Sequence, residues 1–245
     1  VPTRGELKRF ERHTARVWDV ALSPDGRRPA SCGDEVAVRL WDVGSGQFKG
    51  ELKGHHTGVN HIAFSPDGSL LASGGGGRSD PVAAELKLWD AISHQELATL
   101  WQRHGVHSYG YETAWVSSVA FSPDGALLAA AVIDKDPNGP GDSVRLWDVR
   151  NRSLVTTFAA AWVHGVAFSP DGQTLASLGK EGVGESKKEG ELKLWSVASK
   201  ELLTQAAHAL PGLSQRFSSF GTVMGNSCVA FSRDGSELAT ADERG

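Results

Sequence analysis

The chain is poor in cysteine, methionine and long apolar runs, and each shortage excludes a class of protein. Its 245 residues include 2 cysteines and 1 methionine. Cys32 and Cys228 lie far apart and neither belongs to a CxxC pair, which argues against a disulfide framework or a thiolate zinc motif. We expect two buried thiols in a reducing compartment. No apolar run approaches the ~18 residues that a membrane-spanning helix needs.

An excess of one charge sign is also missing. The net charge of −4 gives no broad basic surface, so we expect no nucleic-acid partner and no membrane partner. The N-terminal residues contain no signal peptide, and we therefore expect a cytoplasmic protein. Since the first residue is Val1, we also expect the natural start to lie upstream.

Glycine is abundant, with 29 residues, and two short motifs alternate along the chain. The tryptophan motif has four copies, which are Val38–Val43, Leu86–Ala91, Val144–Val149 and Leu192–Val197. The turn motif Ser-Pro-Asp-Gly begins at Ser23, Ser65, Ser122 and Ser169, and imperfectly at Ser232. Two interleaved motifs at a repeating interval are typical of a repeat architecture, in which each unit is stable only when neighbouring copies pack on it.

The turn motif predicts short strands on either side of it. Proline presets φ, aspartate caps locally, and glycine accepts a positive φ, as a tight turn requires. Val17–Ser23 precedes the first turn as a nearly continuous apolar run, which predicts a strand buried on both faces. Each repeat therefore predicts four short antiparallel strands.

This alternation of motifs resembles the WD40-repeat family, and most closely the near-consensus repeats of bacterial WD40 proteins. The resemblance covers essentially the whole chain and implies an all-β fold, a β-propeller of four-stranded blades around a central channel. It implies the last strand of a preceding blade in residues 1–11, four blades in 12–52, 53–101, 102–158 and 159–206, and half a blade in 207–245. We expect an open arc of a larger, seven-blade type of ring.

In that family a histidine, a hydroxyl, an aspartate and the motif tryptophan form a buried hydrogen-bond chain in each blade. The resemblance carries this structural network onto ten positions, which are His13, Ser31, Glu35, Trp41, His55, Ser73, Trp89, Trp147, Ser177 and Trp195. Glu35 stands where aspartate is usual, the second repeat has no aspartate in register, and Ala130 replaces the hydroxyl in the third. The fourth repeat lacks the histidine. We therefore expect an incomplete network beyond the first repeat, and stability that comes mainly from apolar packing between blades.

Function in repeat proteins lies where the repeats differ. Extra residues fall between second and third strands, or between a fourth strand and the next first strand, and they occupy 74–84, 102–114, 134–142, 179–190 and 208–226. In an antiparallel four-stranded blade these two connections emerge at the same end. We therefore expect all five insertions on one face, as a binding surface.

The residues near these insertions indicate the kind of partner. The candidate partner-binding residues are Arg103, His104, His107, Tyr109, Tyr111, Trp115 and Trp162. Arginine and aromatic side chains are the usual anchors of protein interfaces. Trp115 and Trp162 occupy equivalent positions in adjacent repeats, where they either form an aromatic rim at the channel mouth or pack beneath the long loops. The insertion at 179–190 is charged and is better explained as a solvated loop.

Other chemistry is less well supported. His104 and His107 have an HxxH spacing, and His55, His56 and His61 are close in sequence, but no converging set of zinc ligands is evident. The glycine run 74–77 does not lead into a helix, so flexibility explains it better than phosphate binding. We expect no metal, no cofactor and no catalytic residue.

Three hypotheses follow from the sequence. The first is a non-catalytic scaffold that binds a protein or peptide on the face with the insertions. The second, compatible with the first, is an interaction module of a larger protein whose activity lies in other domains of the same polypeptide. The third is a propeller enzyme of hydrolase or lactonase type with carboxylates in its channel, for which Asp19 is the only distinctive candidate on a first strand.

Overall fold

The chain folds into consecutive antiparallel sheets, as the repeated motifs predict. The computed structural model describes residues 9–77, 83–104, 114–135, 141–180, 190–208 and 228–241. The first repeat forms β1 (Val17–Leu22), β2 (Pro29–Gly33), β3 (Ala37–Trp41) and β4 (Phe48–Lys53). The second forms β5 (Val59–Phe64), β6 (Leu70–Gly77), β7 (Ala83–Asp90) and β8 (Glu96–His104).

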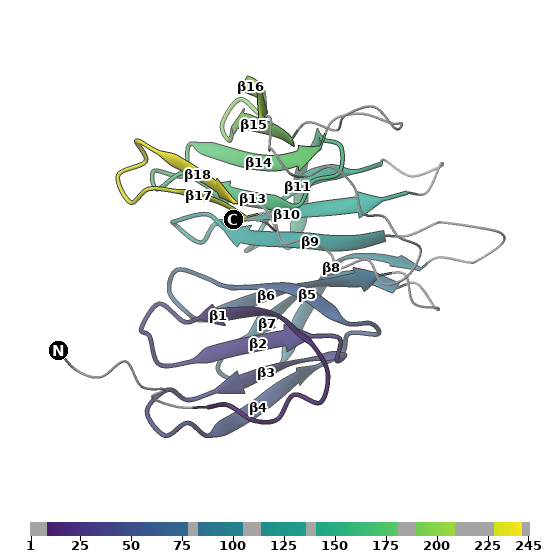
Figure 1. Cartoon of the computed structure of the whole chain (residues 1–245), viewed down its shortest axis with the longest axis vertical. Helices are drawn as coiled ribbons and strands as arrows, with labels where there is room; N and C mark the ends of the chain where they lie inside the picture. The colour runs from purple at the N-terminus through teal and green to yellow at the C-terminus, as the bar shows by residue number, and fades with distance from the viewer. Residues whose placement is uncertain are drawn as a thin grey trace.

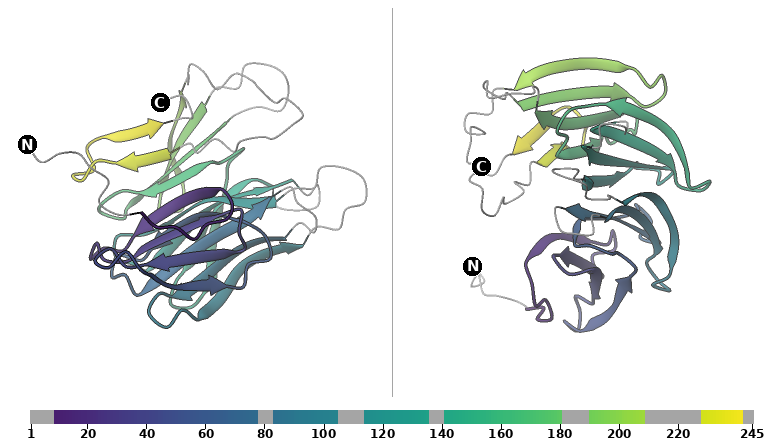
Figure 2. Two further views of the ribbon diagram at one scale, coloured as in Figure 1. Left: turned by 60° about the horizontal axis from the view of Figure 1, so that its bottom comes forward. Right: turned by 90° about the vertical axis from the view of Figure 1, so that its right-hand side faces the viewer.

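The later repeats follow the same order. The third forms β9 (Ala114–Phe121), β10 (Leu127–Asp134), β11 (Ser143–Asp148) and β12 (Ser153–Ala159). The fourth forms β13 (Gly165–Phe168), β14 (Thr174–Lys180), β15 (Gly190–Ser196) and β16 (Leu202–His208), and β17 (Cys228–Phe231) pairs with β18 (Leu238–Ala241). Each set of four strands is a blade of a β-propeller, and the blades stand side by side in an arc (Figures 1 and 2). Within the described ranges, no helix is long or apolar enough to cross a membrane.

The hydrophobic core lies between blades rather than within one of them. One buried cluster joins Val38 and Leu40 of the first blade to Ile62 and Trp89 of the second. Three further clusters fill the next three junctions in the same way. Each blade therefore covers the apolar face of its neighbour, as expected for units that cannot bury that face alone.

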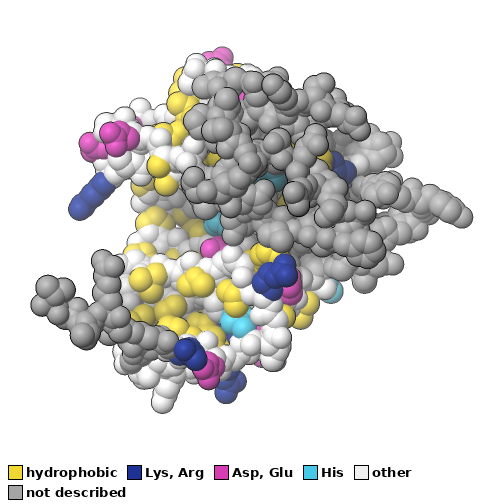
Figure 3. All heavy atoms as spheres, in the orientation of Figure 1, with side chains coloured by type: hydrophobic (Ala, Val, Ile, Leu, Met, Phe, Trp, Pro, Cys, Tyr) yellow, Lys and Arg dark blue, Asp and Glu magenta, His cyan; other side chains and the backbone are white. Residues whose placement is uncertain are grey.

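The prediction that the first strand is buried on both faces is wrong. Val17, Val20 and Leu22 of β1 are exposed, and Val20 keeps 62% of its accessible surface. Figure 3 shows hydrophobic side chains gathered over this part of the surface. β1 lies at the beginning of the arc, so a blade covers only one of its faces, whereas β9 lies between neighbours and is largely buried.

The interpretation of the glycine run as a flexible loop is also wrong. Gly74 to Gly77 form the end of β6, and Gly76 and Gly77 pair with Trp115 and Ala114 of β9. A side chain at Gly76 would meet the backbone of β9 at 2.7 Å. Glycine is therefore required here for close backbone approach, which joins the second and third blades into one eight-stranded sheet.

Only part of the strand predicted before the first blade is described. Of its residues 1–11, these are Arg9, Phe10 and Glu11, and none of them lies in a strand. Phe10 packs on Trp41 with ring centroids 5.4 Å apart. Cys32 is a buried free thiol whose pKa is raised by burial and by the Asp19 carboxylate, and the side chain of Cys228 lies outside the described residues.

Candidate functional site

The strand ends that border the insertions lie at one end of the blades. Five register pairs bring these ends together, namely Ala83 with His104, Gly77 with Ala114, Asp134 with Ala114, Lys180 with Gly190, and Gly190 with His208. We call this the elaborated end, and it lies on the right of Figure 1 and faces the viewer in the right-hand panel of Figure 2. The opposite, short-turn end carries the turn motifs. Their serine hydroxyls bond to the aspartate two residues later.

Trp162 is a constrained aromatic residue at the elaborated end. Its φ of 46° lies in the left-handed region, which is unfavourable for a bulky side chain. Asp142 Oδ2 accepts the Trp162 backbone N–H at 2.9 Å, and the Lys135 ammonium lies 3.7 Å from the centroid of the Trp162 ring. Lys135 also pairs with Asp142. Asp142 thus fixes the backbone of Trp162, and Lys135 packs on its half-buried indole.

Trp115 packs against Trp162. The two indole rings are tilted by 55°, with centroids 6.4 Å apart, so the two equivalent positions meet across adjacent blades. Trp115 is only 4% exposed, which makes it part of the interior rather than of a rim. Of the described pair Trp115 and Trp162, it is Trp162 that offers accessible surface.

Arg103 belongs to a charged cluster next to these aromatic residues. Its Nε lies 3.8 Å from Asp134 Oδ1, and Arg145 Nη2 lies 3.6 Å from Asp134 Oδ2. The Arg145 guanidinium stacks over the Trp101 ring at 4.8 Å. Burial lowers the pKa of Arg145, while Asp134 opposes that shift. In this cluster the partly exposed Arg103 guanidinium lies next to the buried pair of Asp134 and Arg145.

The remaining candidates at this end cannot be placed. His107, Tyr109 and Tyr111 lie outside the described residues, and so does the side chain of His104. Among the residues that are described, no group of three or more histidine, cysteine or acidic side chains converges in a way that would hold a metal ion.

The first blade contains the full hydrogen-bond chain. Trp41 Nε1 donates to Ser31 Oγ at 2.9 Å, Ser31 Oγ lies 2.6 Å from His13 Nε2, and His13 Nδ1 lies 2.7 Å from Glu35 Oε2. Arg39 also donates to Glu35. Burial raises the Glu35 pKa, but the hydrogen bonds from Thr14, Arg39 and His13 outweigh it and lower the pKa to about 2. The longer carboxylate thus reaches the place that aspartate usually takes.

The prediction that the hydrogen-bond chain is incomplete beyond the first repeat is wrong for the second blade. Trp89 Nε1 donates to Ser73 Oγ at 2.7 Å, and Ser73 Oγ lies 2.6 Å from His55 Nε2. His55 Nδ1 then lies 3.3 Å from Oε2 of Glu85, which is 1% exposed. The prediction did not include Glu85, because Glu85 lies on β7 directly after the insertion at 74–84 and is out of register with Glu35. Burial lowers the His55 pKa, so a neutral imidazole links hydroxyl and carboxylate.

The third and fourth blades keep only parts of the chain. Trp195 Nε1 donates to Ser177 Oγ at 2.9 Å. Trp147 is buried in the cluster between the second and third blades, where Ala130 removes the hydroxyl. Every blade nevertheless pairs the basic residue two positions before its tryptophan with a carboxylate, and these pairs are Arg39–Glu35, Lys87–Glu85, Arg145–Asp134 and Lys193–Glu191. Glu85 and Glu191 each stand two residues before their basic partner, and this shared spacing was the one signal in the sequence that pointed to Glu85.

Asp19 occupies a structural position. Its Oδ1 accepts the Val20 N–H at 2.8 Å, and its Oδ2 accepts the N–H of Ile62 in the next blade at 2.9 Å. His61 of the second blade accepts from Val119 of the third, and Ser118 of the third accepts from Val166 of the fourth. These three acceptors share one repeat position, four residues before a turn motif. This position joins the first strands of successive blades.

Comparison with known proteins agrees with this architecture. The family described as "WD domain, G-beta repeat" matches residues 4–42, 46–80, 104–148 and 152–196. The chain is 32% identical over 145 residues to small ribosomal subunit protein RACK1 of Caenorhabditis elegans, covering 58% of this chain and 37% of that protein. It is 29% identical over 234 residues to nuclear distribution protein PAC1 of Arthroderma benhamiae, covering 83% and 46%. The chain thus spans less than half the length of these relatives.

Proposed function

Because the chain belongs to the WD40-repeat family, we propose that it is a non-catalytic scaffold that binds a protein or peptide at its elaborated end. Propellers hold their surface loops on a rigid framework, and the insertions that distinguish these repeats begin and end at one end of the blades. One relative is named for a ribosomal subunit and another for nuclear distribution. The proposed partner is a protein rather than a nucleic acid or a membrane.

The observation that carries the proposal is the conformation of Trp162. A left-handed backbone at a non-glycine residue costs roughly 1–3 kcal/mol and persists only when its surroundings enforce it. Asp142, Lys135 and Trp115 enforce it here. An aromatic side chain held in one orientation loses little entropy when a partner packs on it, which favours binding. Arg103, which pairs with Asp134, adds a partly exposed cation at the same end of the blades.

The proposal extends to the setting of the chain. Since the chain spans less than half of its relatives, we place it as an interaction module of a larger cytoplasmic protein, where other domains of the same polypeptide are further partners. Similarity to bacterial-type repeats remains part of this proposal, whereas the relatives reported above come from a nematode and a fungus.

A capture experiment with matched variants tests the binding end. Wild type, Trp162→Ala and Leu154→Ala are used as baits in extracts of the source cells. Leu154 is the control because it is apolar, exposed and on β12 at the short-turn end. We expect Trp162→Ala to lose at least ~10-fold of the captured protein, in line with an interface anchor, while Leu154→Ala behaves as wild type. Equal capture by Trp162→Ala and wild type, with unchanged folding, would contradict the proposal.

A further inference from the structure

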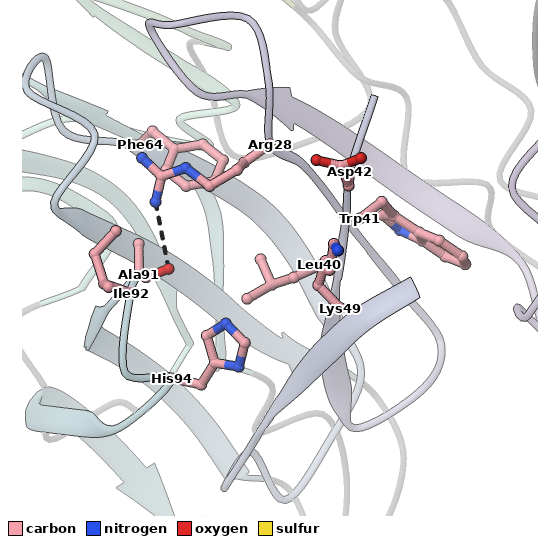
Figure 4. Close-up of a pocket in the computed structure, with 9 residues that line it drawn as sticks. All are labelled: Arg28, Leu40, Trp41, Asp42, Lys49, Phe64, Ala91, Ile92 and His94. Atoms are coloured by element: carbon pink, nitrogen blue, oxygen red, sulfur yellow. Dashed lines mark hydrogen bonds between the residues drawn. The ribbon is translucent and has the colours of Figure 1, made fainter. Parts of the chain in front are cut away.

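A pocket of about 340 Å³ opens between the first two blades, at the short-turn end. Its apolar wall comes from Leu40, Phe64 and Ile92. Arg28, Lys49 and His94 contribute its polar side chains, and Figure 4 shows the His94 ring directed into the space between them. The volume lies in the range of small-ligand pockets, and a single large side chain fits within it. This site is separate from the elaborated end.

The pocket exists because the first junction departs from the next two at a pair of facing positions. The residue five positions after each turn-motif serine is Arg28 at this junction and Leu70 or Leu127 at the next two. The residue two positions after each motif tryptophan in the facing blade is Ala91 here and Val149 or Val197 there.

At the later junctions these facing pairs fill the space. Leu70 and Val149 pack in the cluster between the second and third blades, and Leu127 and Val197 pack in the cluster between the third and fourth. At the first junction, Ala91 is too short to replace valine, and Arg28 reaches across to donate to the Ala91 carbonyl oxygen at 3.4 Å, as Figure 4 shows. The hollow therefore follows from two residue changes within an otherwise repeated interface.

The pocket lining carries two cations, Arg28 and Lys49, and one carboxylate, Asp42, so its net charge is positive. Arg28 donates to the carbonyl oxygens of Gly68 and Ala91, which are neutral, and lies over the Phe64 ring at 5.7 Å. The exposed Asp25 carboxylate lies outside the pocket lining, and Arg28 contributes to the lowering of its pKa. The Asp42 carboxylate, which also borders the pocket, already accepts the N–H and hydroxyl of Ser45. The remaining N–H groups of the Arg28 guanidinium are the donors for a ligand.

The chain backbone also shapes the site for His94. A Cβ at Gly50 on β4 would lie 2.7 Å from His94 Nδ1, so the bare glycine lets the imidazole lie against the strand. The equivalent positions in the later repeats are Ala98, Thr156 and Thr204. His94 at this junction corresponds to Arg152 at the next, whose guanidinium instead bonds to the Leu97 carbonyl oxygen and remains exposed.

We propose that this pocket binds an acidic peptide segment in which an aliphatic side chain stands next to a carboxylate. The aliphatic side chain enters between Leu40 and Phe64 and gains the burial that Leu70 and Leu127 have at the other junctions. The carboxylate accepts hydrogen bonds from Arg28 and Lys49, which gives a charge-assisted contact beside a desolvated ring. The short-turn end thus carries a second peptide site, independent of partner binding at the elaborated end.

Three end-blocked hexapeptides test this chemistry by NMR titration of the full chain labelled with ¹⁵N. The probe has a central leucine–glutamate pair, one twin has leucine–glutamine, and the other has alanine–glutamate. We expect the probe to bind saturably with Kd below about 1 mM and to shift the Ala91 and His94 amide signals, and each twin to bind at least ~10-fold more weakly. Absence of saturable binding by the probe, or equal affinity of the glutamine twin, would overturn the proposal.

Two variants that copy the other junctions complete the test. Ala91→Val and Arg28→Leu introduce the residues found there, and each is expected to weaken probe binding by at least ~10-fold with an unchanged or higher urea midpoint. Trp162→Ala and Leu154→Ala serve as controls that retain wild-type affinity. Because Arg28→Leu removes the charge and Ala91→Val removes the space, each checks the other if one folds poorly. Wild-type affinity in both junction variants would show that the peptide binds elsewhere.

Discussion

A single carboxylate completes the hydrogen-bond chain in each of the first two blades. Glu35 and Glu85 differ in their distance along the chain from the motif tryptophan, yet each ends a chain that runs from tryptophan through serine and histidine. Each also pairs with a basic residue, Arg39 or Lys87, so the carboxylate is ionised and fully engaged. Burial would raise the pKa of Glu85, but the His55 and His56 bonds and the Lys87 charge hold it well below its usual range.

We predict that Glu85→Gln destabilises the chain by about 2–4 kcal/mol. The amide would leave Lys87 without one of its carboxylates in a buried site and would weaken the contacts to both histidines. Chemical denaturation measures the loss. The control is Glu96→Gln, because Glu96 also pairs with Lys87 but is partly exposed, and its loss should stay below about 1 kcal/mol. Equal losses for both variants would contradict the role assigned to Glu85.

The first strands of successive blades are joined by a repeated hydrogen bond from a backbone N–H to a side chain. The enzyme hypothesis did not take this structural role of Asp19 into account. Asp19, His61 and Ser118 each accept an N–H from the next blade, whereas the fourth repeat has Gly165 at the same position. The bond ties β1 to β5, β5 to β9, and β9 to β13. Asp19 is thus explained by architecture.

The prediction for Asp19 separates this role from catalysis. Asp19→Ala should cost about 1–2 kcal/mol of unfolding free energy, because it removes the acceptor for the Ile62 N–H. Asp19→Asn keeps an acceptor oxygen of the same reach and should recover at least half of that loss. Urea denaturation of the three proteins is the measurement. If the asparagine variant loses as much as the alanine variant, the bond to Ile62 is not the reason for Asp19.

The sequence predicts strands and their order well, because motif spacing directly reports turns and tryptophan strands. It predicts contacts less well where they depend on what lies across a junction. Glu85 was missed because an insertion displaced it from register, and Gly76 was interpreted as loop because its partner strand β9 is distant in sequence. The pocket at Ala91 forms because Ala91 is smaller than the valine found at the next two junctions. The sequence does not show this, because it does not say which residues face each other across a junction. The contact of Trp115 with Trp162 was predictable from equivalent positions, whereas the burial of Trp115 was not.

At the scale of the whole molecule, many carboxylates are held in the ionised form by the fold. Hydrogen bonds from Ser65 and Ser69 lower the pKa of Asp67 to about 2, and those from Ser232 and Ser236 do the same for Asp234. The turn-motif aspartates of the other repeats shift in the same direction for the same reason. With Glu35 and Glu85, these groups make the folded state bind fewer protons than the unfolded state in acid.

We therefore predict that stability falls as the pH is lowered. A carboxyl group whose pKa is depressed in the folded state stabilises it fully above the unfolded pKa and loses that contribution as the pH falls through the folded pKa. For Glu35 the window runs from about 4.5 down to about 2. Urea denaturation should show little change between pH 6 and about pH 5 and a steady loss from there to about pH 2, and that loss should be smaller in Glu35→Gln. A stability that stays constant from about pH 5 to about pH 2.5 would contradict this.

The arc as a whole presents two different ends, and the central claim is that its elaborated end binds the partner protein. The most direct test places a benzophenone amino acid at exposed Gln102 on the elaborated end or at exposed Leu154 on the short-turn end, and irradiates each protein in cell extract. Adducts are analysed by mass spectrometry, and Trp162→Ala is introduced into both proteins. We predict a defined adduct from position 102 that disappears with Trp162→Ala, and none of comparable yield from position 154. Adducts of equal yield from both positions, or an adduct at 102 that survives Trp162→Ala, would contradict the account.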